Sequence, residues 1–319
     1  MKDTFGREIN YLRISVTDKC NLRCRYCMPE EGVTDLGHEN ILTYEEIHRI
    51  VEAAAKLGIT KYRLTGGEPL VRRGIVGLVE QMKQIPGVEK ITMTTNGILL
   101  PQLAEKLKAA GLDRVNISLD SLRHDRYREI TRGGELDQAI AGINAASKAG
   151  LTPIKLNVVM MKGFNDDEIL DFVQLTLQKD YEVRFIELMP VGRAENDFAN
   201  GYMSSEEIKA RLPQLIPVEQ QEGVAEIYRI RGALGRIGFI TPISCNFCSQ
   251  CNKLRLTADG KLKTCLHSEK EIDLKKALRE GQQGDLEKVL TEAIKGKEEK
   301  HHLGSGQAPI SRDMNKIGG

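Results

Sequence analysis

Two kinds of segment alternate between Tyr11 and Met189, and this alternation constrains the fold more than any other feature of the sequence. Short stretches rich in β-branched and apolar residues are followed by longer stretches whose apolar residues recur at helical spacing. Such an alternation predicts a parallel sheet with helices on its outer face. The expected strands are 11–17, 61–65, 90–94, 114–119, 153–160 and 182–189, and the expected helices are 44–57, 74–84, 102–110, 136–149 and 166–178. Six such units predict an α/β fold, a partial (β/α)6 barrel of the TIM type rather than a complete eightfold barrel.

The seven cysteines fall into two groups at opposite ends of the chain. The first group is Cys20, Cys24 and Cys27, and the second is Cys245, Cys248, Cys251 and Cys265. The N-terminus has no hydrophobic segment typical of a secretory signal, and no apolar run approaches the roughly 20 residues of a membrane span. We therefore expect a cytoplasmic protein, in which disulfides are rare, so the two groups predict two metal or cluster sites.

The first group follows directly on the first expected strand, at the end of the barrel where active sites are built. Three thiolates can bind an iron–sulfur cluster of four irons and leave one iron open to a small molecule. A structural zinc ion needs four ligands. The nearest further Cys or His in the sequence is His38, so zinc is the less favoured alternative.

The second group leaves the same two alternatives open. Cys248, Cys251 and Cys265 would suit a second cluster, and Cys245 and His267 are spare donors that would also suit a zinc ribbon. We favour an idle Cys245, since a closed site with four ligands would leave no open position for a substrate.

Cations interrupt several of the apolar strands. They are Arg13, Arg63, Lys155 and Arg184. Burial of an unpaired cation is costly, so each one requires a carboxylate such as Glu68, Asp120 or Glu187, or a shared anionic ligand. Convergence of the four on one lumen favours a polyanion such as a nucleoside triphosphate, whose phosphates Arg binds in a bidentate fashion.

The spacing of the first three cysteines, with Tyr26 directly before Cys27, resembles the radical S-adenosylmethionine (SAM) superfamily. Gly66-Gly67-Glu68-Pro69 is similar to the loop of that superfamily that holds the amino group of SAM, and glycines allow the backbone to approach a ligand closely. Further stretches narrow the resemblance to the GTP 3′,8-cyclase family over essentially the whole chain. They are Gly6-Arg7, residues 11–18, Met28-Pro29, residues 94–97, residues 118–120, the C-terminal cysteines and the final Ile317-Gly318-Gly319.

This resemblance implies a radical SAM enzyme that cyclises GTP to (8S)-3′,8-cyclo-7,8-dihydroguanosine 5′-triphosphate, the first step of molybdenum cofactor biosynthesis. It implies SAM and two [4Fe–4S] clusters as cofactors, with the open iron of the second cluster on the guanine base. The implied cluster ligands are Cys20, Cys24, Cys27, Cys248, Cys251 and Cys265, and the implied SAM contacts are Tyr26, Gly67, Ser118 and Met189. The implied GTP contacts are Arg13, Arg63, Thr94, Lys155, Lys253, Leu254 and Arg255, and the implied catalytic residues are Arg13, Arg255, Gly318 and Gly319. Arg184 matches no ligand position, and we expect it to be structural.

The composition changes near residue 200, and we expect two domains. Residues 1–225 would form the barrel, and residues 226–319 a C-terminal region that binds the second cluster and the substrate and ends in the double-glycine tail. Within it, 226–231 and 236–241 are expected to pair antiparallel, ahead of helices at 274–280 and 286–295. The charged stretch 295–306, with His301 and His302, is expected to be a solvated linker.

The charge balance argues against nucleic acid or a membrane as the partner. Lys and Arg number 46 against 45 Asp and Glu, and aromatic residues make up only 5%. The expected partners are GTP, an electron donor that the sequence does not identify, and a downstream cyclic pyranopterin monophosphate synthase that accepts the product. A homodimer is compatible with the sequence. The rival hypotheses are a radical SAM enzyme that modifies peptides and a structural zinc protein.

Overall fold

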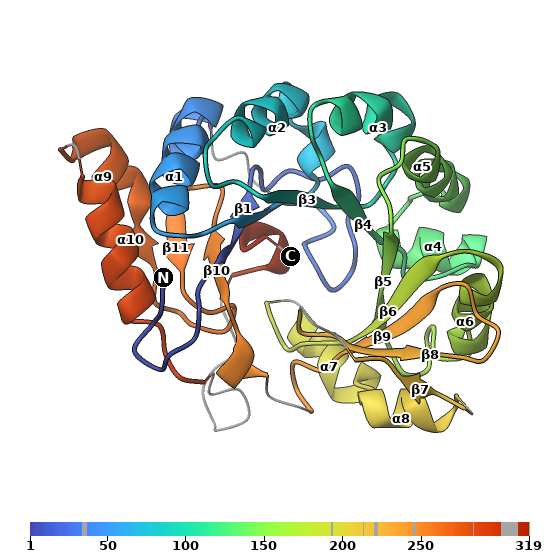
Figure 1. Ribbon diagram of the computed structural model, residues 1–319. Coiled ribbons are helices and arrows are strands. Elements are labelled where there is room, and N and C mark those ends of the chain that lie inside the picture. The colour runs from blue at the N-terminus through green and yellow to red at the C-terminus, as the bar shows by residue number, and fades with distance from the viewer. Residues whose placement is uncertain are drawn as a thin grey trace.

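The computed structural model describes residues 1–33, 37–192, 194–212, 214–219, 223–244, 247–282, 284–300 and 312–318. Its strands form one sheet in the order β12-β11-β10-β1-β2-β3-β4-β5-β6-β9-β8-β7. The sheet curves around a central space, and the C-terminal segment lies inside the curve (Figure 1). The sheet thus has an inner face and an outer face with different chemistry.

The middle of the sheet is built from strands that follow one another in the chain and pair in parallel. They are β1 (Tyr11–Ser15), β2 (Lys61–Thr65), β3 (Lys90–Thr95), β4 (Arg114–Ser118), β5 (Ile154–Met160) and β6 (Tyr181–Glu187). The helices that cover the outer face (Figure 1) are α1 (Tyr44–Lys56), α2 (Ile75–Lys83), α3 (Leu100–Ala109), α4 (His124–Thr131), α5 (Leu136–Lys148) and α6 (Ile169–Gln178). The predicted (β/α)6 barrel is therefore confirmed. Helix α4 was not expected, because its eight residues carry few apolar side chains.

The C-terminal third of the chain extends this sheet at both edges. Strand β9 (Arg236–Ile240) pairs in parallel with β6, and β10 (Lys253–Leu256) pairs in parallel with β1. The expected antiparallel pair is confirmed as β8 (Glu226–Arg229) and β9. The remaining elements are α7 (Ala194–Gly201), α8 (Ser205–Ala210), β7 (Ile216–Pro217), β11 (Lys261–Lys263), β12 (Ile272–Asp273), α9 (Leu274–Glu280), α10 (Asp285–Lys295) and the short 3-10 turns His38–Asn40, Pro69–Val71, Cys248–Gln250 and Met314–Lys316.

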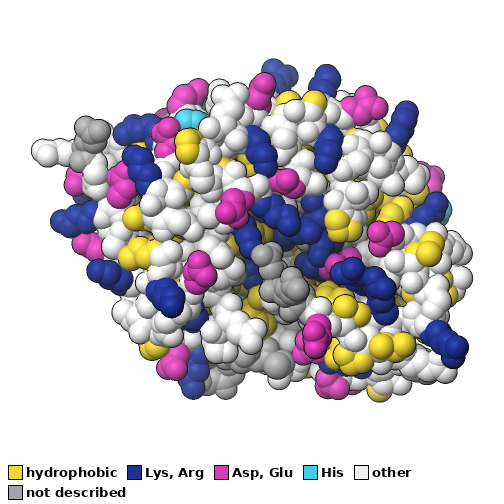
Figure 2. Space-filling view, in the orientation of Figure 1, with side chains coloured by type: hydrophobic (Ala, Val, Ile, Leu, Met, Phe, Trp, Pro, Cys, Tyr) yellow, Lys and Arg dark blue, Asp and Glu magenta, His cyan; other side chains and the backbone are white. Residues whose placement is uncertain are grey.

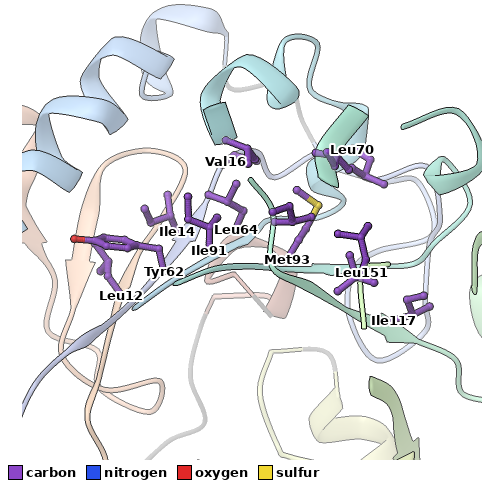
Figure 3. Packing of buried hydrophobic residues seen from close by; sticks show 14 of the residues in the cluster. Leu12, Ile14, Val16, Tyr62, Leu64, Leu70, Ile91, Met93, Ile117 and Leu151 are labelled. Carbon is purple, nitrogen blue, oxygen red and sulfur yellow. The ribbon is translucent and has the colours of Figure 1, made fainter. Parts of the chain in front are cut away.

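The hydrophobic core lies between the outer face of the sheet and the helices. Leu12 and Ile14 of β1, and Tyr62 and Leu64 of β2, are fully buried and point toward this layer (Figure 3). Side chains alternate between the two faces of a strand, so the residues between them point to the inner face. Burial of each such large apolar side chain contributes about 1.5–3 kcal/mol. The core therefore fixes which residues of each strand face the central space.

Helix α1 shows how local sequence supports this layer. Its N-terminus is closed by a capping box between Thr43 and Glu46, and Ile47, Ile50 and Val51 face the core. None of the described helices combines the length and the apolar composition that crossing a bilayer requires.

Candidate active site

The inner face of the curved sheet lines a cavity of about 960 Å³. Residues of β1 to β6 and of β10 contribute to its wall, together with both groups of cysteines. Lys and Arg side chains gather in the hollow near the centre of the face seen in Figure 2. One cavity is thus lined both by cysteines from the two ends of the chain and by a wall of Lys and Arg side chains.

Cys20, Cys24 and Cys27 lie on the loop that leaves the C-terminal end of β1 and are partly buried. The loop is held to the end of α4, because the backbone N–H groups of Arg23 and Arg25 donate to Thr131 O and Ile130 O at 3.0 Å each. Burial raises the pKa of Cys20 to about 11 and that of Cys27 to about 12. A bound metal centre would provide the positive charge that three ionised thiols require.

The three cysteines of the first group present three thiol groups to the same cavity. Thiolates are the protein ligands of iron–sulfur clusters. The first cysteine group therefore has the donor chemistry of an iron–sulfur site.

The second group lies at the opposite end of the strands. Lys253 stands beside Tyr11 at the start of β1, so Cys248 and Cys251, which precede Lys253, lie at the N-terminal end of the barrel. Strand β11 returns antiparallel to β10, which carries Cys265 back to the same end. Burial opposes ionisation of the Cys251 thiol, but the nearby charges of Lys297 and Lys253 outweigh burial and lower its pKa. Cys245 lies outside the described residues.

Cations of neighbouring strands lie opposite one another in the register of the sheet. Arg13 stands between Arg255 and Arg63, and Arg63 stands beside Thr92, which pairs with Arg114. Burial, and then the charges of Arg255 and Arg63, hold the pKa of Arg13 well below its usual range. Burial lowers the pKa of Arg114 to about 10, with Arg63 and Arg184 adding to the effect. Such a concentration of buried positive charge favours an anionic ligand.

The cavity wall also holds buried polar atoms that lack a hydrogen-bond partner within the described residues. They are Arg13 Nε, Thr94 Oγ1, Arg114 Nε, Asn157 Oδ1 and both amide atoms of Asn116. Each unsatisfied buried polar group costs about 1–3 kcal/mol, which a polar ligand would recover. Arg114, Asn116 and Asn157 are not among the site residues predicted from the sequence. The sequence feature that could have identified them is the period of two along a strand, which places them on the same strand faces as Ser118 and Lys155.

Glu182 offsets part of this charge. Its Oε1 accepts from Lys155 Nζ at 2.6 Å and from Arg184 Nε at 2.5 Å. The alternative that the strand cations pair with a structural carboxylate is therefore confirmed for Lys155 and Arg184, but the carboxylate is Glu182 rather than Glu68, Asp120 or Glu187. Glu68, Asp120 and Glu187 accept hydrogen bonds from other groups, including Thr95 Oγ1 at the end of β3, Tyr26 Oη and the N–H of Ser205 at the start of α8. Arg184 also lines the cavity.

The four residues expected to contact SAM all line the cavity: Tyr26, Gly67, Ser118 and Met189. Tyr26 Oη donates to Asp120 Oδ2 at 2.8 Å, and burial raises the pKa of Asp120 to about 6. A Cβ on Gly67 would stand 2.4 Å from Lys19 O, so only glycine lets the β2 loop lie against the cysteine loop. The backbone of Gly66-Gly67 and the first cysteines therefore meet at one end of the cavity.

The C-terminal tail enters the barrel and contacts β1 and the loop that follows it. Arg13 Nη2 donates to Gly318 O at 3.1 Å, and Asn315 Nδ2 donates to Asp18 O at 3.1 Å. Ile317 is fully buried and packs with Val191, Met189 and Leu266. Gly319 and the expected linker residues 301–306, with His301 and His302, lie outside the described residues.

Strand β10 places its residues on two sides. Lys253 and Arg255 line the cavity, together with Arg13, Arg63, Thr94 and Lys155. Leu254 lies between them in the chain, and its side chain is fully buried in the main hydrophobic core. Leu254 can therefore present only its backbone to a ligand in the cavity.

Comparison with known proteins agrees with this site. The model of the Radical SAM superfamily matches residues 14–176, and the model named Molybdenum Cofactor Synthesis C matches residues 181–303. A protein of Alkaliphilus metalliredigens (strain QYMF) named GTP 3′,8-cyclase is 52% identical over 321 residues, which cover 100% of both chains. A protein of the same name from Moorella thermoacetica (strain ATCC 39073 / JCM 9320) is 53% identical over 325 residues, with 100% of both chains covered.

A solved structure supports the fold. The crystal structure of Streptococcus suis SuiB bound to S-adenosylmethionine has a TM-score of 0.57 at 16% identity, over 83% of this chain and 63% of that chain. This likeness concerns the fold alone, whereas the full-length identities are high enough to show the family. The chain belongs to the GTP 3′,8-cyclase family, whose members are radical SAM enzymes of molybdenum cofactor biosynthesis.

Proposed function

We propose that this chain converts GTP to (8S)-3′,8-cyclo-7,8-dihydroguanosine 5′-triphosphate. The observation that carries the proposal is one cavity lined by two three-cysteine groups at its opposite ends and by strand cations between them. Such a cavity suits a radical source at one end, a base-binding centre at the other and a triphosphate against the wall. The full-length relatives named GTP 3′,8-cyclase support the same reaction.

Two [4Fe–4S] clusters would be held by the cysteines. Cys20, Cys24 and Cys27 would bind the first, beside SAM on Tyr26, Gly67, Ser118 and Met189, and Cys248, Cys251 and Cys265 would bind the second, beside the guanine base. When bound, the reduced first cluster would supply the electron for the cleavage of SAM, and SAM would supply the group that accepts hydrogen from C3′ of GTP. Closure of the C3′–C8 bond would then require one further electron, from the electron donor, and one proton.

The chain's own residues hold the substrate and exclude water. Arg13, Arg63, Thr94, Lys155, Lys253 and Arg255 would bind the triphosphate and sugar, with the Leu254 backbone between the last two. Arg suits phosphate because its planar guanidinium donates two parallel hydrogen bonds. We add Arg114, Asn116 and Asn157 to this set, since their unsatisfied atoms line the same wall. Fixed placement restricts the radical to one carbon of the sugar.

The two regions would bind different components of the reaction. Residues 1–225 would bind SAM and the first cluster, and residues 226–319 would bind the base and insert Gly318-Gly319 next to Arg13. Iron–thiolate chemistry is suited to a reducing compartment, which supports a cytoplasmic location. The proposed partners are a reductant of the first cluster and a cyclic pyranopterin monophosphate synthase that accepts the product. The proposed assembly is a homodimer.

The test uses anaerobically reconstituted protein with SAM and dithionite. We expect 5′-deoxyadenosine to form much faster with GTP than with ATP or without nucleotide, together with a new cyclised nucleotide. Formation that is indifferent to nucleotide would favour the rival that modifies peptides. No 5′-deoxyadenosine from protein with intact, reducible clusters would contradict the proposal as a whole.

The affinity for GTP should depend on the protonation of Lys155. Burial, with Arg184 adding to it, lowers the pKa of Lys155 to about 7, although Glu182 opposes the shift. The ammonium is present below this pKa and is lost as the pH rises through it, and triphosphate binding favours the charged form. We therefore expect the Kd for GTP to increase above pH 7, by up to about tenfold per pH unit.

Equilibrium dialysis between pH 6 and pH 8.5 would measure this dependence. The matched control is Lys155→Arg, whose guanidinium stays charged over the whole range. Ionisation of the γ-phosphate and of other residues affects both proteins alike, so the difference between the two curves isolates Lys155. Parallel curves would contradict the prediction.

A further inference from the structure

Two buried cations that the proposed reaction does not use are Arg7 and Lys297. They are only 8% and 3% exposed. Arg7 precedes β1, and Lys297 follows the end of α10, which packs against α1 and α9. Because a buried cation is costly unless it is well bonded, the groups that these two side chains bind indicate their role.

Lys297 joins two of the segments that carry the second cysteine group. Its Nζ donates to Lys253 O at 3.1 Å and also to Thr264 O. Lys253 follows Cys251 by two residues, and Thr264 directly precedes Cys265. One ammonium group therefore fixes the chain next to two of the three cysteines.

Arg7 binds the segment of the third cysteine. Its Nη1 donates to Cys248 O at 2.9 Å and to Glu299 O at 2.8 Å, and its Nη2 donates to Glu298 O at 2.7 Å. The carbonyls of Glu298 and Glu299 belong to the residues directly after Lys297. Arg7 thus links the Cys248 segment to the same stretch of chain that presents Lys297.

The two cations differ in whether an anionic partner neutralises their charge. Arg7 Nε donates to Asp3 Oδ2 at 2.6 Å, and Asp3 is itself only 7% exposed, so this pair is close to neutral. Lys297 Nζ donates to two backbone carbonyls, next to Cys251 and Cys265, and within the described part of the chain it has no carboxylate partner, so its positive charge is retained.

We propose that Arg7 and Lys297 form a two-cation clamp, which holds the three cysteine segments in place and stabilises the reduced form of the second cluster. The inference rests on the second [4Fe–4S] cluster of the proposed function. A cluster on three thiolates carries negative charge that grows on reduction, so a buried cation beside it favours the reduced state. The clamp acts through the ligand segments, which makes both cations positioning residues.

The experiment isolates the second cluster in the full-length chain. The parent is the triple variant Cys20→Ala, Cys24→Ala, Cys27→Ala, reconstituted anaerobically, which should hold about four irons. Lys297→Met in this parent is compared with Lys295→Met, an exposed lysine at the end of α10. The measurements are the midpoint potential, followed by electron paramagnetic resonance, and the rate of iron loss to a chelator.

We expect Lys297→Met to lower the midpoint potential and to lose iron about 10–100-fold faster than the parent, whereas Lys295→Met should match the parent. Lys297→Arg should keep the potential, because it keeps the charge. Arg7→Lys, which keeps the pair with Asp3 but loses the fork, should lose iron faster at an unchanged potential. If Lys297→Met does not fold by circular dichroism, the rate of iron loss from Arg7→Lys still tests the clamp.

The outcomes separate the clamp from the proposed function. A parent that binds no iron overturns the second cluster and the clamp together. A parent with about four irons, whose potential and iron loss do not change in Lys297→Met or Arg7→Lys, overturns the clamp alone.

Discussion

Replacement of Cys24 by alanine should abolish both 5′-deoxyadenosine formation and GTP cyclisation, by at least about 1,000-fold. Cys24 lies between Cys20 and Cys27 on the loop after β1, and all three line the same cavity. Without Cys24 only two cysteine ligands would remain, and the first cluster would not bind stably. The measurements are iron content, 5′-deoxyadenosine by chromatography and the yield of cyclised nucleotide.

The matched control is Cys251→Ala at the other end of the same cavity. This variant should lose the second cluster and cyclisation but keep the slow reductive cleavage of SAM that occurs without nucleotide, because the first site is built by different loops. A Cys24→Ala protein that still cleaves SAM would contradict the assignment of the radical source. Loss of SAM cleavage in both variants would contradict the separation of roles.

Replacement of Gly318 by alanine should lower the rate of cyclisation by about 10–100-fold while both clusters remain. Gly318 has φ +77°, and a Cβ there would stand 2.7 Å from Thr65 Oγ1 and 3.3 Å from Ser15 Cβ. The tail would have to move, and Arg13 would lose the hydrogen bond to Gly318 O. Loss of a hydrogen bond to a charged group costs about 1.5–3 kcal/mol, which corresponds to the expected fall in rate.

Gly163→Ala provides the control for backbone strain. Gly163 has a similar φ of +74°, but a Cβ there would meet nothing within 4 Å. It should therefore leave the kcat of cyclisation unchanged. Equal rates for the wild type and Gly318→Ala, at equal iron content, would contradict a role of the tail in the site.

The ion pairs of Arg312 explain why the substitution of Gly318 is expected to have a large effect. Arg312 donates to both oxygens of Asp259 at 3.1 and 3.0 Å and to Glu271 at 2.7 Å. The tail is therefore fixed before it enters the barrel, and residues 312–318 have little room to adjust at Gly318.

Local patterns in the sequence determined the barrel. The period of two in β1 and β2 separates Leu12 and Tyr62, which face the helices, from Arg13 and Arg63, which face the cavity. The capping box at Thr43 and the helical apolar period predict α1 almost to the residue. The spacing of the first cysteines, within one loop, identified the first site. Each of these signals lies within about one helix or strand, where the geometry of neighbouring residues is fixed by the backbone.

The tertiary structure alone decided how the second half of the site is assembled. Asn252 Nδ2 donates to Asn10 Oδ1 across 242 positions of sequence, at the point where β10 joins β1. That pairing sets Arg255 beside Arg13 and brings the second cysteines to the far end of the cavity. The clamp of Arg7 and Lys297 and the contact of Gly318 with Arg13 are likewise long-range. No periodicity encodes such contacts, because they depend on which strand edges remain unpaired after the local units have formed.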